Sequence, residues 1–118
     1  MIQEEIRTLL DAPPTGDDAP SLDAIEHTLT AGYARALALE AERWRLERKI
    51  ADVAAHIGSG GTDQSELATL GERLSAADGD LTRLRGLLSS LRARATEVRT
   101  AATAVYGSTC RRSKRGAA

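Results

Sequence analysis

The chain has 118 residues, of which 42% are hydrophobic and 28% charged, and this balance is that of a foldable domain rather than of a disordered chain. The formal net charge of −1 excludes a protein that binds polyanions through its overall charge. The sequence has no Phe, and its apolar residues are mostly Leu and Ala, which favour helices over strands and predict an all-α fold.

Three features of the sequence bear on its location. The first residues, Met-Ile-Gln-Glu-Glu, are acidic and are not expected to act as a signal peptide. Cys110 is the single cysteine, so no disulfide framework is expected and a reducing compartment fits. No window approaches about 18 uncharged apolar residues, so no transmembrane segment is expected. Together these features predict a cytoplasmic protein.

Residues 1–11 are predicted to form a short amphipathic helix, because Ile2, Ile6 and Leu9 recur at helical spacing. A helix of this length is marginal in water, so it is expected to persist only when docked on another element. Residues 12–20 contain all three prolines of the chain and are predicted to form a linker.

A long helix is predicted over residues 21–57, with Ser21 as its N-cap. Small or apolar residues alternate in steps of three and four for five heptads, which is typical of a coiled-coil seam. Only Arg43 departs from the apolar rule, and its guanidinium is predicted to reach Asp78 or Asp80, or alternatively to face water. The seam positions are Leu22, Ile25, Leu29, Gly32, Ala36, Leu39, Arg43, Leu46, Ile50, Val53 and Ile57.

A glycine-rich turn is predicted at residues 58–62, followed by a second helix over 63–106 with Asp63 and Glu66 in a capping box. The second helix repeats the alternation of three and four without a slip. Its seam positions are Leu67, Leu70, Leu74, Ala77, Leu81, Leu84, Leu88, Leu91, Ala95, Val98, Ala102 and Val105. Residues 107–118 are predicted to form a basic, disordered tail.

A turn of about five residues makes the two seams meet antiparallel, so the predicted fold is a two-helix coiled-coil hairpin over residues 21–106. Charge favours the same orientation, because Asp23 and Glu26 come beside basic residues of the second helix. Those basic residues are Arg92, Arg94 and Arg99.

Four apolar residues lie outside the seams and are predicted to form a protein-interaction surface: Tyr33, Leu37, Trp44 and Leu87. An exposed apolar surface of this kind usually binds a partner. The expected partner is a second copy, completing a four-helix bundle as a homodimer, or another helical protein. Alternatively, the N-terminal helix covers the far end of the hairpin near Ala102 and Val105.

The charge of the chain is unevenly distributed. Residues 1–30 carry seven acids against Arg7, whereas residues 83–115 carry nine bases against Glu97. The tail is therefore a candidate contact for nucleic acid or an anionic membrane, through Arg111, Arg112, Lys114 and Arg115. No aromatic residue is interleaved to stack on bases, so a solubilising tail is the competing interpretation.

A further pattern on the second helix places Gly79, Gly86, Ala93 and Thr100 seven residues apart on its outer face. Such residues allow a second helix to approach closely, and a genomic bias toward Gly and Ala codons is the alternative explanation.

The sequence predicts no catalytic site, no metal site and no cofactor. Asp23, Glu26 and His27 are close in sequence, but no second cluster completes a metal site. The chain is therefore expected to be a non-enzymatic coiled-coil interaction or scaffolding module. The alternative function is a nucleic-acid or anionic-membrane accessory that binds through its basic carboxyl-terminal part.

Overall fold

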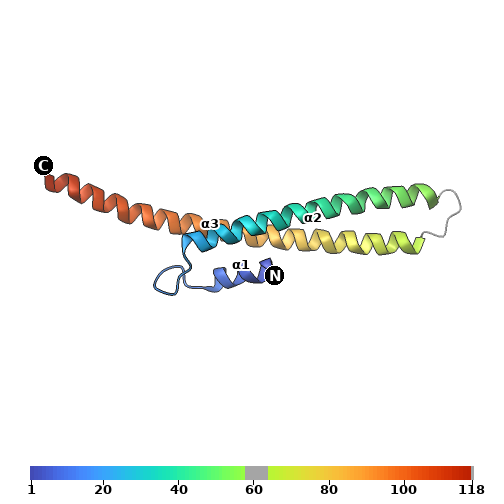
Figure 1. The fold of residues 1–118 in the computed structure, drawn as a ribbon, viewed down its shortest axis with the longest axis horizontal. Helices are drawn as coiled ribbons and strands as arrows, with labels where there is room; N and C mark the ends of the chain where they lie inside the picture. Colours follow the sequence, from blue (N-terminus) through green and yellow to red (C-terminus); the bar gives the residue numbers. More distant parts are fainter. Residues whose placement is uncertain (58–63, 118) are drawn as a thin grey trace. The chain divides into compact units, whose positions relative to one another are not determined.

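The computed structural model describes residues 1–57 and 64–117, and their side chains up to Thr103. In this part of the chain all regular structure is helical, as predicted, and three helices follow one another along the sequence (Figure 1). The chain divides into two compact units. Unit 1 comprises Met1–Ala31 and Leu87–Ala118, and unit 2 comprises Gly32–Gly86.

The first two helices begin and end close to the predicted residues. Helix α1 spans Ile2–Asp11, and the linker after it contains Gly16 at a φ of 98°, a conformation that favours glycine. Helix α2 spans Leu22–Ile57. The backbone N–H of Ala24 donates to Oγ of Ser21 at 3.1 Å, which confirms Ser21 as the N-cap.

Helix α3 spans Gln64–Ala117 and is longer than predicted. The sequence predicts that this helix ends at Tyr106 and that 107–118 form a disordered tail, whereas the backbone stays helical to Ala117. The physical reason is that no proline follows Tyr106, and a glycine such as Gly107 costs a helix only about 1 kcal/mol. The predicted turn at 58–62 and the capping residue Asp63 lie outside the described residues.

Burial follows the heptad pattern closely. Every α2 seam position is buried or half-buried, and so is every α3 seam position from Leu67 to Val98. Ala102 is the exception, since its side chain is exposed, and the side chain of Val105 lies outside the described residues. Helical propensity alone does not produce such a pattern, so a second helix must cover each seam.

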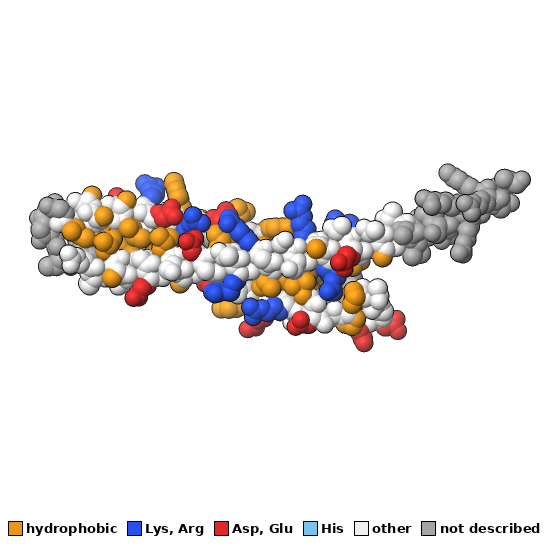
Figure 2. Space-filling view, turned by 180° about the vertical axis from the view of Figure 1, so that it is seen from behind, with side chains coloured by type: hydrophobic (Ala, Val, Ile, Leu, Met, Phe, Trp, Pro, Cys, Tyr) orange, Lys and Arg blue, Asp and Glu red, His pale blue; other side chains and the backbone are white. Residues whose placement is uncertain are grey.

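In unit 2, segments of α2 and α3 pack against each other around a core of small and large aliphatic residues. Its most buried members are Ala36, Leu39, Leu70, Ala77, Leu81 and Leu84. Glu40 pairs with Arg85, and Arg43 pairs with Asp78. The later α2 residue thus meets the earlier α3 residue, so the contacts fit the antiparallel direction of a hairpin. Apolar side chains form a band on the unit 2 face in Figure 2.

Unit 1 adds α1 to the α2 and α3 segments. Its buried residues come from all three helices: Ile6, Ile25, Leu29, Leu88, Leu91 and Ala95. The Arg94 guanidinium donates to the carbonyl oxygens of Leu10 and Ala12, both at 3.2 Å. Helix α1 therefore docks at Arg94 and leaves Ala102 exposed, so the predicted alternative that it covers the Ala102 end is wrong.

Candidate protein-interaction site

Three of the four apolar residues predicted to bind a partner are exposed on α2 within unit 2. Tyr33 is 43% exposed, Leu37 is 67% exposed and Trp44 is 61% exposed. Steps of four and seven residues place them on one side of the helix, because an α-helix repeats every 3.6 residues. We call these three residues the α2 ridge.

The position of the α2 ridge follows from the heptad pattern. Gly32, Ala36 and Arg43 occupy the seam that faces α3. Each ridge residue directly follows one of these seam residues in the sequence. Burying the seam therefore turns the ridge outward. Apolar side chains of this size are usually buried, since each gains about 1.5–3 kcal/mol on leaving water. A surface that leaves three of them in contact with water fits a site that another molecule covers.

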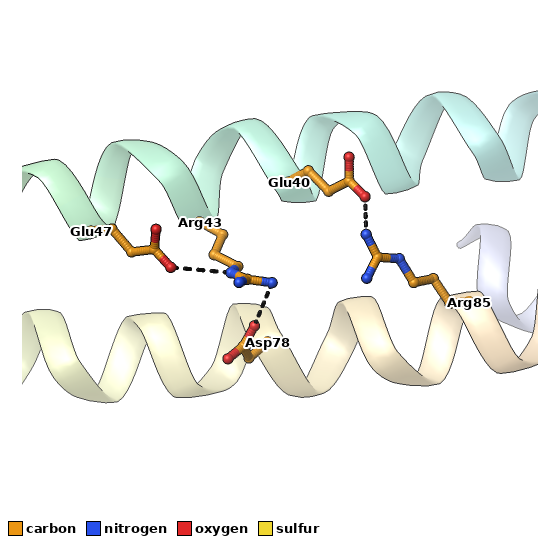
Figure 3. A network of polar contacts seen from close by, with 5 residues as sticks. All are labelled: Glu40, Arg43, Glu47, Asp78 and Arg85. Atoms are coloured by element: carbon orange, nitrogen blue, oxygen red, sulfur yellow. Dashed lines mark hydrogen bonds and ion pairs between the residues drawn. The ribbon is translucent and has the colours of Figure 1, made fainter.

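A network of charges borders the ridge on the side of α3 (Figure 3). Nη1 of Arg43 lies 3.2 Å from Oδ1 of Asp78, and Nε of the same residue lies 3.3 Å from Oε1 of Glu47. Asp78 is one of the two partners that the sequence predicted for Arg43. Glu40 and Arg85 form a second bridge between the two helices. The network fixes the polar edge of the site.

Trp44 lies at the boundary between this network and the ridge. A hollow of about 180 Å³ is lined by Trp44 together with four members of the network: Glu40, Arg43, Glu47 and Arg85. The Arg48 guanidinium carbon lies 5.2 Å from the centroid of the Trp44 ring, within the range of a cation–π contact. The indole is thus oriented by its neighbours while most of its surface stays in water. The Glu40–Arg85 bridge and this hollow were not predicted from the sequence.

The remaining predicted contact residues differ from the ridge. Leu87 belongs to unit 1 and is half-buried, unlike the three ridge residues. The four basic residues Arg111, Arg112, Lys114 and Arg115 fall within the backbone of α3, but their side chains lie outside the described residues. Their role as a polyanion contact stays a prediction.

The described residues hold no cluster of three or more His, Cys, Asp or Glu side chains that could bind a metal ion. Asp23 and His27 are both exposed on α2. Nδ1 of His56 lies 2.7 Å from the carbonyl oxygen of Asp52, one turn earlier in the same helix.

None of the described helices is both long enough and apolar enough to cross a bilayer. Comparison with known proteins finds no matching family model, no matching curated protein and no matching solved structure.

Proposed function

We propose that this chain is a non-enzymatic protein-interaction module: an antiparallel coiled-coil hairpin of α2 and α3 whose α2 ridge binds a helical partner. The single observation that carries the proposal is the exposure of Tyr33, Leu37 and Trp44 on one side of a helix whose other large apolar side chains are buried or half-buried. Trp and Tyr are enriched where proteins bind one another, because a large ring gains much contact area at a small cost in entropy.

The hairpin is supported by the burial of both seams and by the direction of the ion pairs. Glu40 with Arg85 and Arg43 with Asp78 bridge the helices in unit 2. Glu26 with Arg99 does the same in unit 1. Exposed ion pairs contribute only about 0–1 kcal/mol each, so their value lies in selecting the antiparallel register rather than in stability.

The charges of the described part of α3 favour this proposal over polyanion binding. Four of the six arginines whose side chains are described on α3 are already paired within the chain: Arg83 with Asp80, Arg85 with Glu40, Arg94 with Glu97, and Arg99 with Glu26. A phosphate would have to displace those carboxylates, which lowers the gain from each contact. Polyanion binding would therefore depend mainly on the four basic residues from Arg111 to Arg115, with Arg73 and Arg92 as the other exposed arginines of α3.

The proposal is tested by photo-crosslinking in cells of the native organism. A photoreactive amino acid replaces Leu37 on the ridge in one variant, and the exposed Glu42 on another side of α2 in the matched control. We expect a discrete crosslinked species from position 37 and little from position 42. Adding Trp44→Ala to the first variant should reduce its yield about tenfold or more, as expected for a central aromatic contact.

Either a second copy or a different protein at position 37 would support the module. Equal crosslinking at positions 37 and 42, or a yield that Trp44→Ala leaves unchanged, would contradict it. Circular dichroism of each variant establishes that the helices are intact. Truncation before residue 108 tests the polyanion alternative, because loss of binding to nucleic acid or anionic vesicles at low salt would support that function instead.

A further inference from the structure

A series of small residues lies on the outer side of α3 within unit 2. We call Ser75, Gly79, Thr82 and Gly86 the α3 small face; their steps of four, three and four place them together on the helix. Gly79 is half-buried, and the other three residues are exposed. A helix surface built from such small residues lets another helix approach closely.

The two glycines are not required by packing within the chain. A Cβ atom built on Gly86 would meet no atom within 4 Å, and one built on Gly79 would meet only the flexible Arg83 side chain, at 3.8 Å. Both residues have ordinary helical backbones, since Gly16 is the glycine with positive φ among the described residues. Glycine inside a helix is nevertheless unfavourable relative to alanine. Close approach of a helix from another molecule would explain why glycine stands at both positions.

The α2 ridge and the α3 small face border the same ion pair. Glu40 stands one turn from both Leu37 and Trp44, and its partner Arg85 stands one turn from Thr82. The two surfaces therefore lie on the same side of the α2 and α3 segments of unit 2. The α2 ridge and the α3 small face thus lie side by side on unit 2.

The ion pairs also set the level of each residue along the two helices. Taken together, the Arg43–Asp78 and Glu40–Arg85 pairs bring Trp44 close to the level of Gly79. Leu37 precedes Trp44 by seven residues, and Gly86 follows Gly79 by seven. Because α2 and α3 run antiparallel, Leu37 comes to the level of Gly86 by the same step. Leu37 and Trp44 of the ridge thus each have a glycine close to their own level on the other helix.

We propose that the partner of the α2 ridge is a second copy of this chain, bound by a two-fold axis parallel to the helices. In this dimer Trp44 of one copy packs on Gly79 of the other, and Leu37 packs on Gly86. The ridge and the α3 small face of each copy are then both covered, so the two-fold interface is closed and isologous. The α2 and α3 segments of unit 2 from both copies form a four-helix bundle. The inference rests on the proposed function and names its partner.

Charge favours the same arrangement. Arg48 stands one turn beyond Trp44, and Glu72 stands two turns before Gly79, so the two exposed side chains come to neighbouring levels at the edge of the interface.

The proposal is tested by sedimentation velocity of the full chain over a range of concentrations. We expect a reversible dimer whose dissociation constant rises about tenfold or more in Trp44→Ala and likewise in Gly79→Leu. The control is Ser65→Leu, which adds the same side chain to an exposed position of α3 outside the small face, and it should dimerise as the wild type does. Gly79→Leu should also keep or raise the helical content of the dilute monomer, because leucine is the better helix former.

A wild type that stays monomeric at every concentration would overturn the dimer, and so would a dimer that Gly79→Leu leaves unchanged. If the chain is monomeric but position 37 still crosslinks a different protein in cells, the interaction module stands and only the second copy is wrong. If neither association depends on Trp44, both proposals fail.

Disulfide trapping tests the arrangement of the helices, in a Cys110→Ser background. Ala41 of α2 and Thr82 of α3 are exposed and lie within one turn of Trp44 and Gly79, respectively. Oxidising a mixture of Ala41→Cys and Thr82→Cys chains should give a covalent dimer in higher yield than oxidising either variant alone. Preferential crosslinking of Ala41→Cys to itself would instead indicate α2 against α2, contrary to the proposal.

Discussion

Arg43 is the one charged residue at a seam position, and its environment explains why the pattern tolerates it. The aliphatic part of the side chain covers the seam while the guanidinium leaves it sideways to meet Asp78 and Glu47. The side chain is 40% exposed, so it keeps much of its hydration and avoids the cost of a buried charge. A second hollow nearby is lined by Leu39, Leu46 and Ala77 of the seams together with flanking charged residues such as Glu42 and Asp80.

Replacing Arg43 by leucine should therefore stabilise the chain. The two exposed ion pairs contribute about 0–1 kcal/mol, whereas a leucine that fills the seam gains about 1.5–3 kcal/mol when fully buried. We expect a net rise of about 1 kcal/mol in the free energy of unfolding, measured by urea denaturation followed by circular dichroism. The matched control is Arg45→Leu at an exposed position outside the seam, which should change stability by less than about 0.5 kcal/mol. Destabilisation by Arg43→Leu would indicate that the ion pairs matter more than the seam.

Helix α1 depends on contacts far away in the sequence. The carbonyl groups at its end have no partner within the helix, and Arg94 of α3 supplies donors to two of them. The Arg94 side chain of α3 is only 20% exposed, and Ile6 of α1 is fully buried. An isolated helix of ten residues is marginal in water, so these contacts hold α1 in place.

Arg94→Ala should release α1 while leaving α2 and α3 folded. We expect the backbone amides of Ile2–Asp11 to lose most of their protection in hydrogen exchange, with those of α2 in unit 2 unchanged. Arg92→Ala is the control, because Arg92 is an exposed arginine on the same helix. Unchanged protection of α1 in Arg94→Ala would show that the buried Ile6 suffices to dock this helix.

Local sequence patterns were sufficient to predict the bounds and the buried side of α2, but they did not predict where α1 docks. The Ser21 cap and the alternation of three and four residues are written in consecutive residues, so the boundaries and the buried side of α2 follow from them. The contact between Arg94 and the end of α1 joins residues more than 80 positions apart, and a short amphipathic helix fits several apolar surfaces equally well. The end of α3 was missed because a glycine weakens a helix without terminating it.

The candidate site likewise combines features that depend on local spacing with features that depend on contacts between the helices. Helical spacing placed Tyr33, Leu37 and Trp44 outside the seam, and all three are exposed; their role in binding a partner stays a prediction. The half-buried state of Leu87 and the hollow beside Trp44 depend on which flanks of the two helices lie together, and spacing within a single helix does not determine this. Prediction of the polar edge succeeded at Arg43 because its seam position left few acidic partners within reach.

At the scale of the whole molecule, stability and association should be carried by different leucines. Leu84 is fully buried in the core of unit 2, whereas Leu37 is 67% exposed. We expect Leu84→Ala to lower the free energy of unfolding by about 2–5 kcal/mol, and Leu37→Ala to lower that of the dilute monomer by less than about 0.5 kcal/mol. Leu37→Ala should nevertheless weaken binding to the partner of the ridge. Equal destabilisation by the two substitutions would mean that Leu37 is covered within the chain.

The antiparallel pairing of α2 with α3 is tested most directly by the distance between spin labels at His27 and Thr96. Both positions are exposed, and they lie near the end of α2 that is farthest from the 58–63 segment. Double electron–electron resonance is measured on doubly labelled chains diluted with excess unlabelled protein, so that it reports on one chain. A hairpin predicts a distance of roughly 20 Å or less, because packed helix axes lie about 8–10 Å apart. A distance beyond about 50 Å, as expected when helices rising about 1.5 Å per residue extend away from each other, would contradict the hairpin.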